Sequence, residues 1–499
     1  ESTFEKQVIF NNAFFLNQET EINYIEVSFL GAIFKDRAYF YNITFKSMID
    51  FSYAIFENEV RFCNTYFESV VHFSFTKFKG VCDFSNTKFL ATQKKEERNR
   101  ICFDDTEFED IVHFYSAKFE SKVLFCKSVF KSKVNFNGAE FSTSHYDDAE
   151  INNFDNVTFE SDAWFDDIIF NSSVLFSKCE YKGNIYMRNI TSKQQLYFYE
   201  SLFLSNVYFN NSHFKDYVSF CECEFEKTAC FYGVKFDKTP NFSQAIFKGN
   251  LNVVNTNLNF TFDDLQERIK QEYEDFNKNI ENKKPLDKFA NDFRDSFRIF
   301  KSALIKDNNL LDASNFHKYE LYCKEIELKN KKGKTFKDVV DRWQLLFYRK
   351  LCDHHTNLIL NLKWFIVIVG FFTSILFGLR YGDGNLMQFF NKDSDLLKML
   401  KNILNIKALN DSNATYLILL YSFIGLFFVR TFFIFYYLVI FILMLAISPY
   451  NLFTMINFAI RHETNSFLEN IIIIIYTLSI VLIIFSLQKT ARKNSIVPS

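Results

Sequence analysis

The stretch "VRFCNTYFESVVHFSFTKFKGVCDFSNTKF", residues 60–89, places phenylalanine at regular intervals. The rings alternate in steps of five and six residues, at Phe62, Phe67, Phe73, Phe78, Phe84 and Phe89. A small or β-branched residue precedes each ring by two positions: Val60, Thr65, Val71, Thr76, Cys82 and Thr87. Residues two apart in an extended chain point to the same side. Each pair therefore predicts a very short strand whose two side chains face one interior.

The same eleven-residue period extends over about half of the chain, which indicates a repeat architecture. It runs through residues 29–56, 103–141, 154–181 and 198–247, and a charged break at 91–100 interrupts it. An eleven-residue period can also mark a right-handed helical supercoil. That alternative fails because the apolar positions would scatter around a helix without forming a stripe. Aromatic and β-branched residues also favour extended chain.

These observations predict a solenoid in which two eleven-residue repeats form one square coil with four inward rings. Successive coils stack by backbone hydrogen bonds at about 4.8 Å, so residues 1–258 predict about eleven or twelve coils and a rod of about 55 Å. Burying one phenylalanine fully contributes about 1.5–3 kcal/mol. The aromatic interior can therefore offset the entropy lost when such short strands become ordered.

The pattern small-x-Phe-x-x resembles the repeat of pentapeptide-repeat proteins. Its alternation of five-residue and six-residue steps is similar to that of a bacterial subgroup of these proteins in which phenylalanine is the central residue. Here every second unit has six residues, and phenylalanine stands where leucine is commoner. The resemblance implies a β-solenoid, a right-handed quadrilateral β-helix, over 1–258. The whole fold class is then this solenoid followed by an α-helical domain and an α-helical transmembrane bundle. The repeat specifies the fold and says almost nothing about function.

After Leu258 the apolar residues follow steps of three and four, which predicts a helical cap or spacer domain over 259–334. The stretch 297–325 resembles a helical hairpin that often follows the β-helix in membrane-anchored pentapeptide proteins. A solenoid needs its open end covered, so we expect a cap. The alternative to a cap is that this helical domain forms a regulatory site.

Residues 335–356 predict an amphipathic helix at a membrane interface. One side of this helix carries Phe336, Val339, Trp343 and Phe347. Residues 357–499 then predict a transmembrane domain of about four helices with a short basic C-terminal tail. Runs at 358–379 and 469–489 are long and apolar enough to span.

Two shorter spans are expected at 414–430 and 431–448, with Arg430 at the turn between them. A charged residue within the membrane is costly and commonly functional. If Arg430 lies within the membrane and not at a cytoplasmic turn, it is a functional candidate in the membrane domain.

Charge is divided between the two halves of a chain whose net charge is −2. Residues 1–260 carry 35 acidic and 26 basic side chains, whereas the rest of the chain carries 24 acidic and 31 basic side chains. Basic residues beside apolar segments indicate the cytoplasmic side of a membrane. The bias towards Phe, Asn, Lys and Ile suggests a bacterial genome. We predict a multi-pass protein of the bacterial inner membrane, with the β-helix and both termini in the cytoplasm.

Ten cysteines favour a reduced, cytoplasmic protein over a disulfide framework. Cys82, Cys179 and Cys223 occupy the small inward position, whereas Cys221 and Cys230 should point outward. We expect no metal site in this group.

The polar segment containing Cys352, His354 and His355 is likewise interpreted as a membrane edge, because adjacent histidines on a helix do not share a face. The chain shows no motif for a nucleophile, a phosphate loop or a metal array. The sequence therefore predicts no enzyme activity, no catalytic residue, no metal ligand and no cofactor.

Three functional classes remain. The first is an integral membrane protein whose β-helix is a rigid protein-interaction scaffold. The second is an oligomeric pore or ion-channel-like transport component gated by the β-helix. The third is nucleic-acid mimicry, which the resemblance suggests, but the modest acidity of the rod is weak beside about one charge per 1.7 Å of DNA duplex. The expected partners are the lipid bilayer, a protein on the β-helix faces and a second copy of the chain; nucleic acid is not expected.

Overall fold

The computed structural model describes residues 2–15, 27–90, 100–142, 151–278, 283–381 and 467–491. Contacts divide the chain into two compact units, Glu1–Arg342 and Trp343–Pro498. The first unit holds the repeat region and helices α1 to α3. The second holds α5 (Leu358–Tyr381) and α10 (Phe467–Ala491), while α4 (Phe336–Cys352) crosses the division. Each unit is described by itself.

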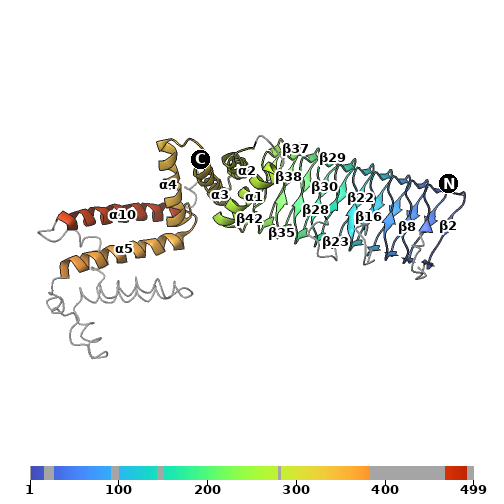
Figure 1. Ribbon diagram of the computed structural model, residues 1–499, viewed down its shortest axis with the longest axis horizontal. Coiled ribbons are helices and arrows are strands. Elements are labelled where there is room, and N and C mark those ends of the chain that lie inside the picture. The colour runs from blue at the N-terminus through green and yellow to red at the C-terminus, as the bar shows by residue number, and fades with distance from the viewer. Residues whose placement is uncertain are drawn as a thin grey trace, which may run out of the picture. The chain divides into compact units, whose positions relative to one another are not determined.

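The repeat region is a four-sided β-solenoid, as predicted (Figure 1). Its strands run from β1 (Thr3–Phe4) to β42 (Asn257–Leu258), and nearly all of them contain two residues. They form four parallel sheets, named here sheets 1 to 4 after their lowest-numbered strands, β1, β2, β3 (Phe14–Phe15) and β4 (Val27–Ser28). Each coil contributes one strand to each sheet, because the next strand of a sheet is usually the fourth one along the chain.

The solenoid has fewer coils than predicted. Sheets 1 to 3 contain eleven described strands each and sheet 4 contains nine. Eleven strands are joined by ten steps, which at about 4.8 Å per step gives about 48 Å. The prediction of eleven or twelve coils assumed that all of residues 1–258 form regular coils.

Three long connections account for this difference. Paired residues of neighbouring coils are normally 22 apart, as in Val60↔Cys82. Three insertions lengthen this separation to 29 or 30 residues, as in the pairs Thr3↔Ile33, His72↔Cys102 and Leu124↔Asn153. All three extra lengths fall between a strand of sheet 3 and the following strand of sheet 4. Together they use about one coil's worth of chain.

The phenylalanine rings fill the interior. The six rings on the five-six steps of residues 60–89 all have an exposed fraction of 0%. Rings of successive coils stack, and Phe51 and Phe73 have centroids 5.1 Å apart with planes inclined by 1°. Rings on opposite sides of the tube meet edge to face, as with Phe62 beside sheet 2 and Phe73 beside sheet 4, whose planes are inclined by 77°. Both geometries suit the ring quadrupole.

Small polar residues are tolerated inside because each finds a backbone acceptor. The Thr76 hydroxyl donates to the carbonyl of Phe51 over 2.8 Å, and the Cys179 thiol contacts the carbonyl of Phe154 at 2.9 Å. In both cases the acceptor lies 25 residues earlier. Buried donors are thereby satisfied, as protein interiors require.

Cysteines at the inward positions are buried as predicted, but one outward cysteine is buried as well. Cys82, Cys179 and Cys223 are at most 1% exposed. Cys230 pairs with Asn252 on the outer side of sheet 2, yet only 6% of it is exposed. Cys230 therefore points outward as expected, but other parts of the chain cover it. Helix α2 packs against β41 (Leu251–Asn252), the strand next to Cys230.

Three helices follow the last coil: α1 (Phe262–Asn277), α2 (Leu286–Lys306) and α3 (Leu310–Asn330). Thr261 and Asp264 form a reciprocal capping box that starts α1. The Asn309 side chain accepts from the Asp312 amide and caps α3.

Helix α2 closes the C-terminal end of the aromatic interior. The ring of Phe300 lies 4.7 Å from that of Phe242 and 6.0 Å from that of Phe231. The Tyr319 hydroxyl of α3 donates to the carbonyl of Leu258 over 3.0 Å and also reaches that of Phe260. The helices therefore give the last rings an apolar cover in place of water.

We predict that Phe73→Ala lowers the free energy of unfolding by about 3–5 kcal/mol, because it removes a stacked ring and leaves a cavity. Phe75→Ala is the matched control, since this nearby ring is 45% exposed and lies at a corner. The control should lose less than about 1 kcal/mol. Guanidinium unfolding followed by far-UV circular dichroism measures both, and equal losses would contradict an aromatic interior.

Candidate functional site

A buried polar cluster lies where the ends of α4, α5 and α10 meet in the second unit. It consists of Cys352, His355, Asn361, Ser486 and Thr490, each less than 9% exposed. Arg430, the candidate named from the sequence, and the expected spans at 414–430 and 431–448 lie outside the described residues. Within the described ranges, no group of three His, Cys, Asp or Glu side chains is placed to hold a metal ion.

Helices α5 and α10 are antiparallel and mostly apolar. The rings of Phe372 and Tyr476 lie 5.2 Å apart, while Asn361, near the start of α5, bonds to Ser486 and Thr490, near the end of α10. On α10 the buried side chains recur at helical spacing: Tyr476, Ile480, Ile483, Ser486 and Thr490. The remaining sides of α10 expose large apolar residues, such as Leu478 at 60% and Phe485 at 63%.

One helix of the described chain, Asn470–Ala491, is long and apolar enough to cross a membrane. At 1.5 Å per residue its 22 residues span about 33 Å, which matches a hydrocarbon core of about 30 Å. It coincides with the expected span at 469–489. The apolar segment Leu358–Phe372 of α5 is shorter and falls within the expected span at 358–379.

A corner of unusual backbone conformation separates α4 from α5. Asp353, His354 and His355 all have positive φ angles, of 51°, 53° and 69°. The left-handed region costs L-residues about 1–2 kcal/mol each, so surrounding bonds must hold the corner in place. The His354 amide donates to the carbonyl of Tyr348 over 3.1 Å, and the Asn357 amide donates to that of Cys352 over 3.1 Å.

Hydrogen bonds within the cluster connect this corner to α10. The Asn361 Nδ2 donates to the Ser486 hydroxyl over 2.9 Å and reaches the Thr490 hydroxyl at 3.3 Å. The His355 Nδ1 lies 3.3 Å from the Thr490 hydroxyl and 3.5 Å from the Cys352 sulfur. Such bonds between apolar helices contribute about 0.6 kcal/mol each on average, and up to about 2 kcal/mol. The cluster therefore fixes the pairing and register of α5 and α10.

The two titratable side chains of the cluster, Cys352 and His355, are both uncharged at neutral pH. Burial lowers the pKa of His355 to about 4, with a contribution from the positive charge of Lys489. Burial also raises the pKa of the Cys352 thiol. A nucleophilic cysteine needs a stabilised thiolate beside a charged histidine. Cys352 and His355 form instead an uncharged pair, which suits a structural contact between helices.

The sequence favours a polar membrane edge at Cys352, His354 and His355, and it does not single out Asn361, Ser486 or Thr490. One signal was present, because Asn361 and Ser486 are polar residues within long apolar runs. Polar residues in such runs commonly bond to a neighbouring helix. The partner helix could not be named, since Asn361 and Ser486 are 125 residues apart.

The apolar side of α4 is exposed to solvent. Phe336 is 85% exposed, Trp343 is 66% exposed and Phe347 is 46% exposed. Val339 and Val340 are also exposed. Leu351 and Cys352, at the end of α4, are instead buried together with Ile483 of α10. Helix α4 is therefore anchored at one end and leaves an apolar stripe uncovered along most of its length.

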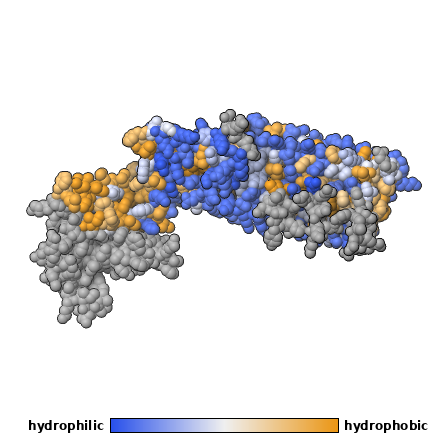
Figure 2. All heavy atoms as spheres, in the orientation of Figure 1, coloured by the Kyte–Doolittle hydropathy of each residue, from blue (hydrophilic) through white to orange (hydrophobic). Residues whose placement is uncertain are grey.

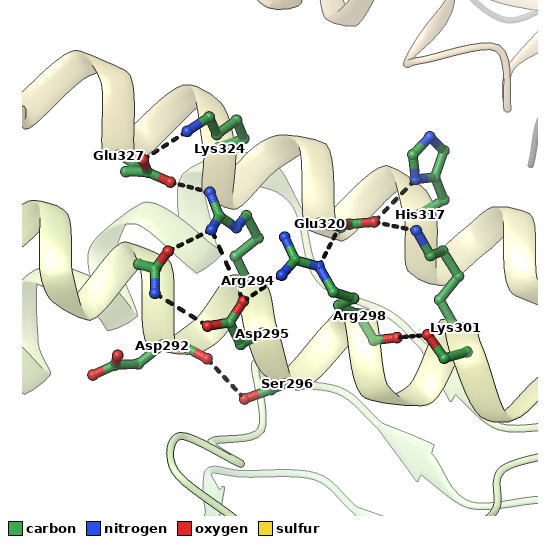
Figure 3. Close-up of polar contacts among 12 residues, drawn as sticks. Asp292, Arg294, Asp295, Ser296, Arg298, Lys301, His317, Glu320, Lys324 and Glu327 are labelled. Carbon is green, nitrogen blue, oxygen red and sulfur yellow. Dashed lines mark hydrogen bonds and ion pairs between the residues drawn. The ribbon is translucent and has the colours of Figure 1, made fainter. Parts of the chain in front are cut away.

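Helices α2 and α3 are joined by ion pairs (Figure 3). Glu327 of α3 contacts Arg294 of α2 and lies 2.7 Å from the Nζ of Lys324. Glu320 of α3 accepts from Arg298 and Lys301 of α2, at 3.1 and 2.7 Å.

His317 lies one turn before Glu320 on α3 and completes this charge network. Its Nδ1 is 3.1 Å from the Glu320 carboxylate. Burial alone would raise the pKa of Glu320, but hydrogen bonds from His317 and Lys301 outweigh it and lower the pKa to about 2. The network stabilises the hairpin that covers the β-helix.

Residues 29–76 match the family described as Pentapeptide repeats (9 copies). No curated protein and no solved structure matches the chain. The family match and the four-sided solenoid agree with the resemblance drawn from the Phe-centred steps. The chain therefore contains a pentapeptide-repeat β-solenoid, which is followed by helices and by an apolar C-terminal helix.

We predict that Glu320→Gln destabilises the cap in a pH-dependent way. The folded-state pKa is depressed, so the ionised carboxylate stabilises the fold above the unfolded pKa of about 4.5, and this contribution disappears as pH falls towards 2. The loss at neutral pH should reach at most about 3 kcal/mol. Thermal unfolding at several pH values measures it. Glu274→Gln, at an exposed ion pair of α1, should show almost no effect.

We predict that Asn361→Ala weakens the pairing of α5 and α10 by about 1–2 kcal/mol, because two hydroxyl groups lose their donor. Leu362→Ala, one residue further along the same helix and 45% exposed, is the control. Thermal denaturation of the detergent-purified chain compares the two. Equal midpoints for both variants would show that the polar cluster does not hold the helices together.

Proposed function

We propose that this chain is an integral membrane protein whose pentapeptide-repeat β-helix serves as a rigid protein-interaction scaffold in the bacterial cytoplasm. The apolar outer surface of α10 carries the membrane part of the proposal. Large side chains of a water-soluble protein rarely form an exposed apolar surface of this extent. Figure 2 shows apolar residues gathered along α5 and α10, while polar residues predominate over the β-helix and its cap.

The charges beside α5 and α10 support a cytoplasmic orientation. The helices are antiparallel, so the start of α5 and the end of α10 lie on one side of the second unit. Basic residues accompany both ends, at Arg349 and Lys350 before α5 and in 489–493 at the end of α10. Excess Lys and Arg mark the cytoplasmic side of membrane proteins. Ten free cysteines fit the same reducing compartment.

The outer face of sheet 2 supports the scaffold part of the proposal. Trp164, Tyr186 and Tyr208 stack in a row on successive coils, with centroids 5.6 and 5.4 Å apart. The guanidinium of Arg188 lies 5.2 Å from the centroid of Tyr186. Tryptophan, tyrosine and arginine carry most of the binding energy in protein interfaces. This aromatic row, Trp164, Tyr186 and Tyr208, is the face on which a protein partner is expected.

We predict that the full chain stays with membranes through an alkaline wash, and that a chain truncated after residue 357 does not, since it lacks α5 and α10. A photo-crosslinking residue at Tyr186 should capture a discrete protein in cells. The same residue at Tyr66, exposed on sheet 3, should not. Retention of the truncated chain after the wash would contradict the anchor. Ion flux through vesicles holding the purified chain would favour the pore instead.

A further inference from the structure

The exposed stripe of α4 ends where the proposed membrane helices begin. Five residues, 353–357, separate Cys352 from Leu358. Trp364 of α5 donates its indole N–H to the carbonyl of Lys350 over 2.8 Å, so the end of α4 is fixed to the start of α5. The stripe, defined here as Phe336, Val340, Trp343 and Phe347, therefore continues directly from a membrane-entry point.

The direction of α4 suits a helix lying on a membrane surface. In Figure 1, α4 crosses the ends of α5 and α10 and does not run beside them. The three left-handed residues at 353–355 end α4 and permit this change of direction. When α5 and α10 span a bilayer, a helix crossing their ends lies in the headgroup plane.

The charge of this segment identifies what it would contact. Residues 331–352 contain seven basic and two acidic side chains. One of the two acids, Asp338, is already paired with Lys331 at 2.9 Å. Lys332, Lys337 and Lys350 are exposed. Lysines beside an apolar stripe can extend their ammonium groups to lipid phosphates while their stems cover apolar surface.

We propose that α4 docks on the membrane through its apolar stripe and binds anionic lipid headgroups through Lys332, Lys337 and Lys350. This rests on the proposed function, since α5 must enter the bilayer for α4 to reach its surface. Docked in this way, α4 and the corner at 353–355 connect the β-helix and its cap to the bilayer by a surface-bound segment. The anionic lipid then favours one orientation of α4 over all others.

The test compares the full chain with a Trp343→Phe variant, so that the difference between their tryptophan fluorescence reports on Trp343 and the bond from Trp364 to Lys350 is kept. The full chain is reconstituted in phosphatidylcholine vesicles, with or without phosphatidylglycerol, and with lipids brominated at a shallow or a deep acyl position. In anionic vesicles we expect shallow bromines to quench Trp343 more than deep ones, because such helices enter only about 5–10 Å. High salt should reduce this quenching, since it screens surface charge.

Replacing Lys332, Lys337 and Lys350 with glutamine should lower the ratio of docked to undocked α4 by about fivefold for each lysine. The matched control replaces Lys193, Lys215 and Lys238, three exposed lysines of the β-helix, and should change nothing. Equal quenching with and without phosphatidylglycerol would overturn the proposal. So would a Trp343 that neither bromine quenches, which would mean that protein covers the stripe.

An alkaline wash of the same vesicles separates this proposal from the proposed function. If the chain resists the wash but Trp343 is unquenched, the docking of α4 is wrong and the anchor stands. If the wash removes the chain, the proposed membrane anchor itself has failed.

Discussion

Ring stacking at the spacing of the backbone ladder is the interaction on which this protein depends. Parallel strands of neighbouring coils lie about 4.8 Å apart, and an aromatic stack needs a similar spacing. Phe103 and Phe125 have centroids 4.6 Å apart, and Phe56 and Phe78 have centroids 5.1 Å apart. Phenylalanines at equivalent positions of successive coils can therefore contact one another without distorting the hydrogen bonds. This match explains how strands of two residues form a stable interior.

The same constraint creates a problem at the end of the rod. The last rings have no further coil above them, so they need another apolar surface. Phe300 of α2 provides that surface, and the charge network around Glu320 holds α2 against α3. The cap is thus a consequence of the aromatic interior. The helices beyond it have a different requirement, because the exposed apolar sides of α10 need a lipid or protein environment.

The period and inward positions could be predicted from the sequence because they are local and repeated. Within residues 60–89, each of the six phenylalanines on the five-six steps is buried. The coil count was less predictable, since a connection such as the one between His72 and Cys102 adds residues without adding a coil. The burial of Cys230 depends on helices that follow in the chain. The polar cluster joins Asn361 to Ser486 and Thr490, and a single sequence contains no signal that pairs residues so far apart.

Hydrogen–deuterium exchange on the full chain in lipid vesicles tests the central claim most directly, that the chain combines an aromatic-filled β-helix with a helix pair that enters the membrane. The account predicts slow exchange in the strands of 27–258 and in Asn470–Ala491, and faster exchange at the outer face of the cap. Rapid exchange throughout Asn470–Ala491 in vesicles, or throughout the strands, would contradict it.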